Sequence, residues 1–168
     1  AFFRTAISGD QVQFVAYAFV DDTDLFTSSE DPESTAMEVA QELQRSLTWW
    51  EGGIRATGGA IEPSKSFWYL IDFQWQRGEW RYAMQQECPF DLKVRDLNGT
   101  IQTLRRFEMD HAERTLGVLI APDGSWKTEF EYLKDASRKW ADNIRAGKLP
   151  KHLVWLSMTT TILRTLQY

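Results

Sequence analysis

The feature that most constrains the fold is an apolar run that ends at three closely spaced acids. In Tyr17–Phe26 (YAFVDDTDLF), aromatic and aliphatic residues lead directly into Asp21, Asp22 and Asp24. Side chains alternate along a strand, so two adjacent acids cannot face the same way within a regular strand. At the tip of a hairpin both carboxylates can approach one ion, and hard oxygen ligands suit Mg²⁺ or Mn²⁺. We therefore expect VQFVAYAFV to be a buried strand leading into a hairpin, with Asp21 and Asp22 as metal ligands.

The same acids have two other interpretations. They can form a solvated turn, in which aspartates cap and bend the backbone. An EF-hand loop counted from Asp22 fails, because Phe26 occupies its fifth position and Thr27 replaces the glycine needed at the sixth. From the residues alone, metal ligands and structural turn acids both remain open.

The rest of the pattern predicts an α+β fold. AFFRTAI is the predicted hairpin partner of the first strand, with its turn at residues 8–10. Asp31 is the predicted N-cap of a helix, with Pro32 at the first helical position and an end before Gly52. The predicted apolar face of this helix comprises Ala36, Ala40, Leu43, Leu47 and Trp50.

Further strands and two more helices are predicted downstream. FWYLIDFQW is predicted to be one strand that turns at residues 76–78 into EWRYAM, and RTLGVLIAP is predicted to be a single short strand. FDLKVRDLNGTIQTLRRF is predicted to be a hairpin with Asn98-Gly99 as its two-residue turn.

The last two helices have their own start and stop signals. Ser125 is the predicted cap of a helix to about Arg145, with Gly147 as the left-handed residue after it. Pro150 is predicted to open the final helix. The apolar stripe of the first of these helices comprises Phe130, Leu133, Ser137, Trp140 and Ile144.

Composition excludes some functional classes. Cys88 is the only cysteine, so an internal disulfide is impossible, and with His111 and His152 alone it makes a poor zinc site. We expect an intracellular location, nuclear or cytoplasmic, and no membrane span. Residues 1–72 have a net charge of −8 and residues 127–168 of +4, which suits metal ions at one end and phosphates at the other. The alternative is that both groups of charges belong to an ordinary solvated surface with no binding role.

Tryptophan is abundant, and its positions are expected to be mainly structural. We interpret these side chains as core and hairpin packing, with base stacking as the alternative. The residues concerned are Trp49, Trp50, Trp68, Trp75 and Trp80.

Three motifs in order are similar to a known enzyme family. YAFVDDTDL resembles the catalytic turn of reverse transcriptases. In that family the turn has the pattern aromatic residue, any residue, Asp, Asp, and it lies between two strands of the palm. The family's G-L-x-x-N-x-x-K segment before an apolar strand resembles TGGAIEPSKSFWYLI, where Lys65 takes the lysine position. RTLGVLIAPDG resembles the family's Leu-Gly strand, with Leu116 and Gly117 in that place. The order is most similar to reverse transcriptases of non-LTR retrotransposons.

The resemblance implies three parts: residues 1–75 as a partial palm with the Asp-Asp hairpin, helix and lysine loop, residues 76–124 as a β-hairpin region with the Leu-Gly strand, and residues 125–168 as a two-helix, thumb-like segment. The family's upstream palm strand, which supplies another metal-binding Asp, and its fingers have no counterpart in the 168 residues. We therefore expect a fragment of a longer polymerase chain that is inactive by itself.

The chemistry that the resemblance implies is RNA-directed DNA synthesis. A primer 3′-hydroxyl attacks the α-phosphate of a deoxynucleoside triphosphate, with two Mg²⁺ ions about 3.5–4 Å apart. Asp21 is the implied main ligand and Asp22 a second or outer-sphere ligand. Lys65 is the implied proton donor near the leaving pyrophosphate. The alternative is that Lys65 is an ordinary solvated lysine in a loop with no role in catalysis.

The basic C-terminal segment, residues 127–168, is the main implied contact with the RNA template and DNA primer. The implied nucleic-acid-binding residues are Leu116, Gly117, Arg138, Lys139, Arg145, Lys148 and Lys151. Solvated helix charges are the alternative for the five basic residues.

Three hypotheses for the whole chain follow: a reverse transcriptase fragment, a non-catalytic nucleic-acid- or protein-binding module derived from one, and an unrelated α+β domain whose acids are structural.

Overall fold

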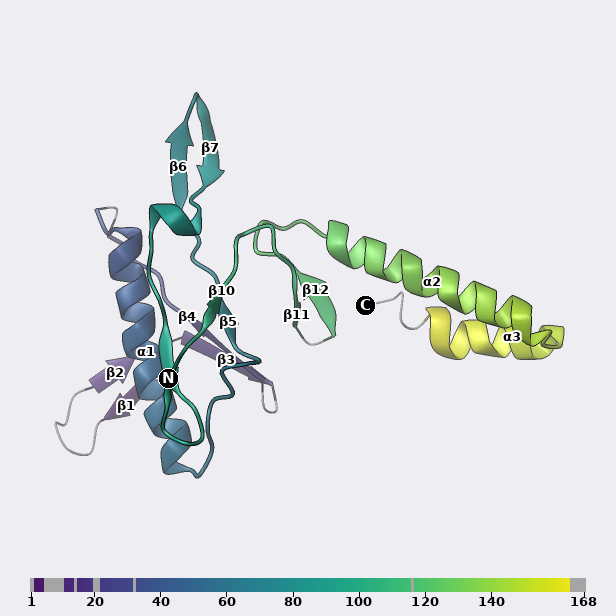
Figure 1. The fold of residues 1–168 in the computed structure, drawn as a ribbon, viewed down its shortest axis with the longest axis horizontal. Helices are drawn as coiled ribbons and strands as arrows, with labels where there is room; N and C mark the ends of the chain where they lie inside the picture. The colour runs from purple at the N-terminus through teal and green to yellow at the C-terminus, as the bar shows by residue number, and fades with distance from the viewer. Residues whose placement is uncertain are drawn as a thin grey trace. The chain divides into compact units, whose positions relative to one another are not determined.

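The computed structural model describes residues 2–4, 11–13, 15–19, 22–31, 33–115 and 117–163. They form an α+β chain of helices and short strand pairs (Figure 1), which confirms the predicted class. The chain divides into two compact units, Ala1–Glu108 and Met109–Tyr168, and each is described by itself below.

Unit 1 (Ala1–Glu108) contains one long helix and ten strands within its described residues. The helix is α1 (Ala36–Ala56), and a single 3₁₀ turn, η1, covers Gln85–Glu87. The strands are β1 (Phe2–Arg4), β2 (Gln11–Gln13), β3 (Val15–Phe19), β4 (Asp22–Phe26), β5 (Phe67–Trp68), β6 (Phe73–Gln76), β7 (Glu79–Tyr82), β8 (Lys93–Arg95), β9 (Ile101–Thr103) and β10 (Arg105–Arg106). β5 and β10 pair in parallel, and the other pairs are antiparallel hairpins: β1–β2, β3–β4, β6–β7 and β8–β9.

Unit 2 (Met109–Tyr168) contains one hairpin followed by helices. Its elements are β11 (Glu113–Thr115), β12 (Val118–Ile120), α2 (Lys127–Gly147), α3 (Lys151–Ser157) and a π-helical segment, η2 (Met158–Ile162). β11 and β12 pair antiparallel. The helix α3 begins directly after Pro150, as predicted.

The N-terminus of α1 is set by a capping box, not by Asp31. The Thr35 backbone N–H donates to the Glu38 carboxylate over 2.8 Å, and the Glu38 backbone N–H donates to Thr35 Oγ1 over 3.3 Å. Asp31 instead closes a local turn by accepting from the Glu33 N–H, and Pro32 lies outside the described residues. The prediction of Asp31 as N-cap is wrong because the reciprocal Thr35–Glu38 pair satisfies two helix-end N–H groups at once.

The C-terminal end of α1 also differs from the prediction. The helix passes through Gly52-Gly53 and ends at Ala56, with Thr57 as its C-cap. Glycine lowers helix propensity without forbidding the helix. Here Glu51 and Arg55, on either side of the glycines, are both bound to another element, so tertiary contacts override the local preference.

The apolar core of unit 1 lies between α1 and the strands that follow it. Ala40 and Leu47 from the predicted apolar face are buried, as expected. The buried cluster comprises Leu47, Trp68, Leu70, Cys88, Leu92, Val94 and Leu104. Leu25 of β4 and Leu43 of α1 pack against this cluster, which attaches the β3–β4 hairpin to the helix.

Polar side chains of α1 pair with the backbone of β8. Gln44 Nε2 donates to the Lys93 carbonyl over 2.8 Å, and the Lys93 N–H donates to Gln44 Oε1 over 2.7 Å. Two turns further along the helix, the buried Glu51 accepts from the Arg95 N–H over 3.0 Å. Arg55 donates to the Asp96 carbonyl and is also ion-paired to Glu51. The helix thus takes the place of a neighbouring strand at the free edge of β8.

The predicted strand FWYLIDFQW is two strands with different partners. β5 pairs with β10, whereas β6 pairs with β7, so residues 69–72 leave one pairing and enter the other. The predicted turn into β7 is confirmed: Gln76 pairs with Glu79. The two residues between them, Arg77 and Gly78, have φ values of 54° and 86°, as a type I′ hairpin turn requires.

The loop of the next hairpin is one residue longer than predicted. Asp96 donates its N–H to the Thr100 carbonyl over 2.9 Å, which leaves residues 97–99 as the connection. Only Gly99 has a positive φ, 83°, as in a type I turn followed by a glycine bulge. The cause is Asp96 Oδ1, which accepts from the Asn98 and Thr100 N–H groups and favours the longer loop.

Both ends of α2 are shifted from their predicted positions. Trp126, not Ser125, occupies the N-cap position, and no side chain caps the helix. Ser125 instead donates its N–H to Asp123 Oδ1 over 2.7 Å in the preceding turn. At the other end Gly147 is still helical, and Lys148 takes the left-handed conformation with a φ of 48°.

Among the described residues, every helix is too short or too polar to cross a membrane.

Replacing Gln44 with Ala is expected to destabilise unit 1 by about 1–3 kcal/mol, because two backbone groups of Lys93 lose their partner. Gln41→Ala is the matched control, since Gln41 is exposed on the same helix, and we expect a change within about 0.5 kcal/mol. Urea unfolding of the two variants measures the difference. Equal stabilities would contradict the pairing of α1 with β8.

Lowering the pH is expected to loosen the attachment of β7 to η1. Arg81 forms an ion pair with Glu87. Hydrogen bonds from Arg81, and then from the Met84 N–H, lower the pKa of Glu87 from 4.5 to about 2. A lowered pKa stabilises the fold above the ordinary value of 4.5, and this stability is lost as the pH falls towards 2.

The comparison of Glu87→Gln with the wild-type chain measures this effect. The two unfolding midpoints should differ at pH 6 and converge near pH 2, because the substituted glutamine cannot ionise. Glu79→Gln on the same hairpin, exposed and without an ion pair in the described residues, is the control and should show no such convergence. A constant difference between wild type and Glu87→Gln at every pH would contradict the assignment.

Candidate functional site

The β3–β4 hairpin places Asp22, one of the two predicted acids, beside its tip. In the antiparallel register Phe19 pairs with Asp22, which leaves positions 20 and 21 as the connection. Asp22 is exposed and begins β4. Asp21 lies outside the described residues, so the prediction of two adjacent ligands remains a prediction.

Asp24 belongs to the same exposed face as Asp22. The sequence interpretation placed it in a turn, but it lies within β4, opposite Tyr17. Asp22, Asp24 and Phe26 are exposed, whereas Thr23 and Leu25 are half-buried. Residues two apart in a strand lie about 7 Å apart on one face. The acidic face therefore comprises Asp22 and Asp24, and the D-x-D spacing was the signal for it in the sequence.

The opposite face of β4 fixes the hairpin to the rest of unit 1. Leu25 packs against the buried cluster together with Ala36, Met37 and Leu43 of α1. On the exposed face, the rings of Tyr17 and Phe26 meet edge to face with centroids 5.7 Å apart. The hairpin is thus held by its apolar side, and its acids face solvent.

The donor set of this face fits a hard divalent cation in part. Asp22 and Asp24 provide carboxylate oxygens and have no ion pair with another described residue. In the described part of the chain, no group of three or more His, Cys, Asp or Glu side chains lies close enough together to hold a metal ion. Mg²⁺ is bound in proteins through one or two carboxylates with substrate phosphates and water completing its shell, so two acids are a sufficient protein contribution.

Lys65 lies in a tightly bonded loop of unit 1. Its backbone N–H donates to the Glu62 carbonyl over 3.2 Å, and its side chain is exposed. The Ser64 hydroxyl and N–H lower the pKa of Glu62, and Arg105 donates to the Ser64 carbonyl over 3.1 Å. Within the described part of unit 1, Lys65 makes no ion pair with Asp22 or Asp24, so its proposed role stays a prediction.

Gly117 lies in a turn and not in a strand. Thr115 pairs with Val118, so residues 116 and 117 connect β11 to β12. Gly117 is exposed with a φ of 93°, which favours glycine, and Leu116 lies outside the described residues. The prediction of RTLGVLIAP as one strand is wrong because this left-handed glycine reverses the chain.

The predicted basic contacts are all exposed on unit 2, and they differ in their pairing. Arg138 lies 3.6 Å from Asp135 and Arg145 lies 3.5 Å from Asp142, each one turn away on α2. Lys139, Lys148 and Lys151 are exposed and have no ion pair with any other residue the structure describes. Exposed pairs one turn apart are weak, so all five side chains remain accessible to an anion.

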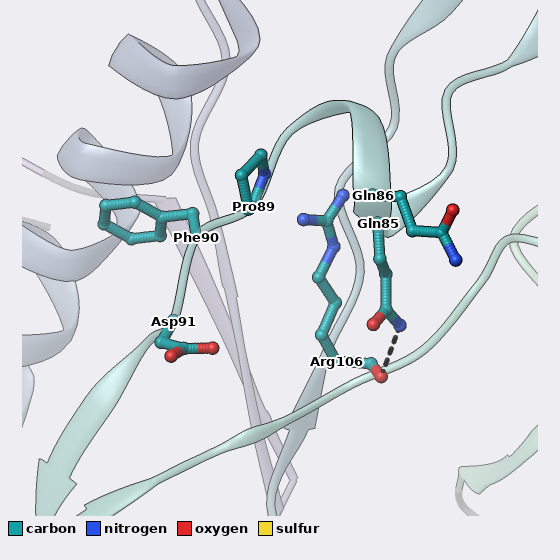
Figure 2. A pocket seen from close by; sticks show the side chains of 6 residues that line it. All are labelled: Gln85, Gln86, Pro89, Phe90, Asp91 and Arg106. Carbon is teal, nitrogen blue, oxygen red and sulfur yellow. Dashed lines mark hydrogen bonds between the residues drawn. The ribbon is translucent and has the colours of Figure 1, made fainter.

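A shallow cavity of about 320 Å³ near η1 was not indicated by the sequence. Figure 2 shows Arg106 extending between Pro89 and Gln86, with a hydrogen bond of 2.7 Å from Gln85 Nε2 to the Arg106 carbonyl. The Arg106 guanidinium lies 5.0 Å from the centre of the Trp68 ring and donates to the Cys88 carbonyl. Arg106 thus has a structural role in the wall of the cavity.

Comparison of the chain with protein-family models, with curated proteins and with solved structures finds no match. The site must therefore be interpreted from its own chemistry.

Asp22→Asn is expected to weaken Mn²⁺ binding to the chain by about tenfold or more, because the acidic face loses one of its two described carboxylates. Asp24→Asn should have a similar or smaller effect. Asp110→Asn removes an exposed acid of unit 2 and is the matched control. Titration followed by the electron paramagnetic resonance signal of free Mn²⁺ measures all four proteins. Equal affinities would exclude a metal site on this face.

Proposed function

We propose that the chain is the part of an RNA-directed DNA polymerase that extends from the catalytic turn into the thumb. The observation that carries the proposal is the β3–β4 hairpin, which presents Asp22 and Asp24 to solvent while Leu25 binds it to α1. An acidic hairpin followed directly by a packed amphipathic helix is the order that the reverse transcriptase palm implies. A structural turn alone does not require two acids on one open strand face.

Each residue has a separate role in the proposal. Asp21 and Asp22 hold Mg²⁺ or Mn²⁺, with Asp24 available on the same face as a further oxygen donor. Bound ions would supply charge stabilisation at the reacting phosphate. Lys65, exposed and charged, neutralises or protonates the leaving pyrophosphate.

Unit 2 is the proposed nucleic-acid contact. Lys139, Lys148 and Lys151 are exposed and unpaired within the described residues, and Arg138 and Arg145 are held only by weak pairs. Their contacts with template and primer phosphates would weaken as salt rises, because neutralised phosphates release counterions. The glycine turn at Gly117 allows close approach of a backbone, and it remains the proposed counterpart of the primer-gripping pair with Leu116.

A second candidate function is a non-catalytic binding module derived from the same family. The observation that favours it is the exposed aromatic side of the β6–β7 hairpin, including Trp75 and Trp80, which no catalytic role uses. The two candidates differ in whether the acids of the hairpin are needed for activity.

Primer extension on an RNA template tests the proposal. The 168-residue chain alone should bind the template–primer and not extend it. A longer chain that includes the upstream coding sequence should extend the primer in Mg²⁺. Asp21→Asn and Asp22→Asn should each lower that rate by more than about 100-fold, since even the partners of metal ligands contribute about 10–100-fold.

Asp110→Asn serves as the control and should leave extension unchanged, because Asp110 is an exposed acid of unit 2. Template–primer binding without extension by the longer chain would favour the non-catalytic module. Neither binding nor extension would exclude the polymerase and a nucleic-acid-binding module, and would leave a protein-binding module as the second candidate.

A further inference from the structure

The β6–β7 hairpin exposes a continuous apolar face. Two cross-strand pairs form it: Phe73 with Tyr82, ring centroids 4.9 Å apart, and Trp75 with Trp80, 5.1 Å apart. The Ala83 N–H donates to the Asp72 carbonyl, so the strand alternation continues and adds Ile71 and Met84 to the same face. Five of these six side chains are more than half exposed: Phe73 (55%), Met84 (57%), Ile71 (59%), Trp75 (60%) and Trp80 (68%).

The size of this face is in the range of the largest apolar patch on a typical monomer. Each aromatic side chain has about 150–250 Å² of surface, so the exposed apolar area of the five is on the order of 500 Å². Exposed apolar patches of this size are often functional. In Figure 1 the hairpin extends away from α1, so that helix does not cover it.

The other side of the hairpin holds this face in one conformation. Arg81 donates to Gln76 Oε1 over 2.7 Å and to Gln74 Oε1 over 3.1 Å, and it is ion-paired to Glu87 of η1. The two-residue turn at Arg77-Gly78 fixes the strand register. The rings are therefore ordered before any partner arrives, which lowers the entropy cost of binding.

The charges around this face disfavour a nucleic acid. Residues 71–87 contain three acids and two arginines, and Glu87 neutralises Arg81. Residues 1–108 have a net charge of −7. Single-strand platforms combine aromatic rings with a positively charged groove, whereas unit 1 is acidic overall and none of the six side chains of this face is basic.

The same charges favour a cation. Elsewhere in the chain aromatic rings accept basic side chains: Arg106 lies over Trp68 and Arg114 over Tyr132, each 5.0 Å from the ring centre. Tryptophan is the strongest acceptor of such contacts. Trp75 and Trp80 are nevertheless without a cation from any described residue, and their rings meet at 68°, edge to face, which leaves ring surface open.

We propose that the aromatic face of the β6–β7 hairpin binds a basic segment of another protein, in which Lys or Arg side chains alternate with apolar ones. The apolar side chains pack on Ile71, Phe73 and Met84, and the cations lie over Trp75 and Trp80. This inference does not depend on the polymerase proposal, because none of its residues takes part in the metal site.

Calorimetric titration of the full chain with two synthetic peptides tests the proposal. One hexapeptide alternates Leu and Arg, and the other has citrulline in place of Arg, which keeps the shape and removes the charge. At about 0.15 M salt, where charges are screened beyond about 8 Å, the Arg peptide should bind about tenfold more tightly.

Variants of the two tryptophans separate the ring contact from general attraction to an acidic chain. The double variant Trp75→Leu/Trp80→Leu should weaken binding of the Arg peptide about tenfold, and Trp75→Phe/Trp80→Phe should lie between, because Phe is a weaker acceptor. Trp126→Leu, at an exposed tryptophan of unit 2, is the matched control and should change nothing. Unfolding midpoints of all variants show that the hairpin is retained.

Four results would overturn the proposal: equal affinity for the two peptides, full binding by the folded double Leu variant, binding of octathymidylate that the double Leu variant loses, or concentration-dependent dimerisation that the same variant abolishes. The third would indicate a nucleic-acid platform and the fourth a contact between two copies of the chain.

Discussion

The pairing of α1 side chains with the backbone of β8 is the contact on which the arrangement of unit 1 depends. Gln44 satisfies both backbone groups of Lys93, and Glu51 accepts from Arg95. These bonds fix the rotation of the helix about its own axis. With that rotation fixed, Leu43 and Leu47 face the buried cluster, and Leu25 of β4 packs there too. The acids of β4 then face solvent because the other side of the strand is occupied.

The two units differ in how their charged side chains are used. In unit 1 several are bound to specific partners: Glu51 is buried, Arg81 bonds to three side chains, and Arg106 lies on Trp68. In unit 2 no described residue of α2 or α3 is buried, and the ion pairs of α2 join residues one turn apart. Loosely held basic side chains on an exposed helix suit a polyanion, whereas open carboxylates on a fixed hairpin suit a metal ion. The proposed division of function between the units follows from this difference.

The sequence predicted the local features whose cause is local. The α+β class, the β3–β4 hairpin, the turn at Arg77-Gly78 and the helix after Pro150 are confirmed, because alternation, turn residues and proline act over a few positions. The prediction of VQFVAYAFV as one buried strand is wrong: β2 pairs with β1 and β3 with β4, and Tyr17 is 69% exposed. Errors arose where two local signals compete. The T-x-x-E pattern of Thr35 and Glu38 overrides Asp31, and Asp96 lengthens the loop at Asn98-Gly99.

Features that depend on distant residues could not be predicted in this way. The division of FWYLIDFQW into β5 and β6 follows from pairing with β10, and the helix continues past Gly52 because Glu51 and Arg55 bind β8 and its loop. Trp68 is buried as the packing interpretation expects, whereas Trp75 and Trp80 pair with each other and stay exposed. For the candidate site, the Asp22–Asp24 face required the observed strand register, and Asp21, Leu116 and the polymerase resemblance itself stay predictions.

The most direct measurement of the central proposal is the effect of Mn²⁺ on the nuclear magnetic resonance spectrum of the ¹⁵N-labelled chain. A bound paramagnetic ion broadens the amide signals of nearby residues. If the acids of the β3–β4 hairpin hold a divalent cation, the signals of residues 19–25 should broaden first and recover when excess Mg²⁺ displaces the Mn²⁺. Broadening that begins elsewhere, for instance at the exposed acids Glu30 and Glu33, or equally at all exposed acids, would contradict the proposal.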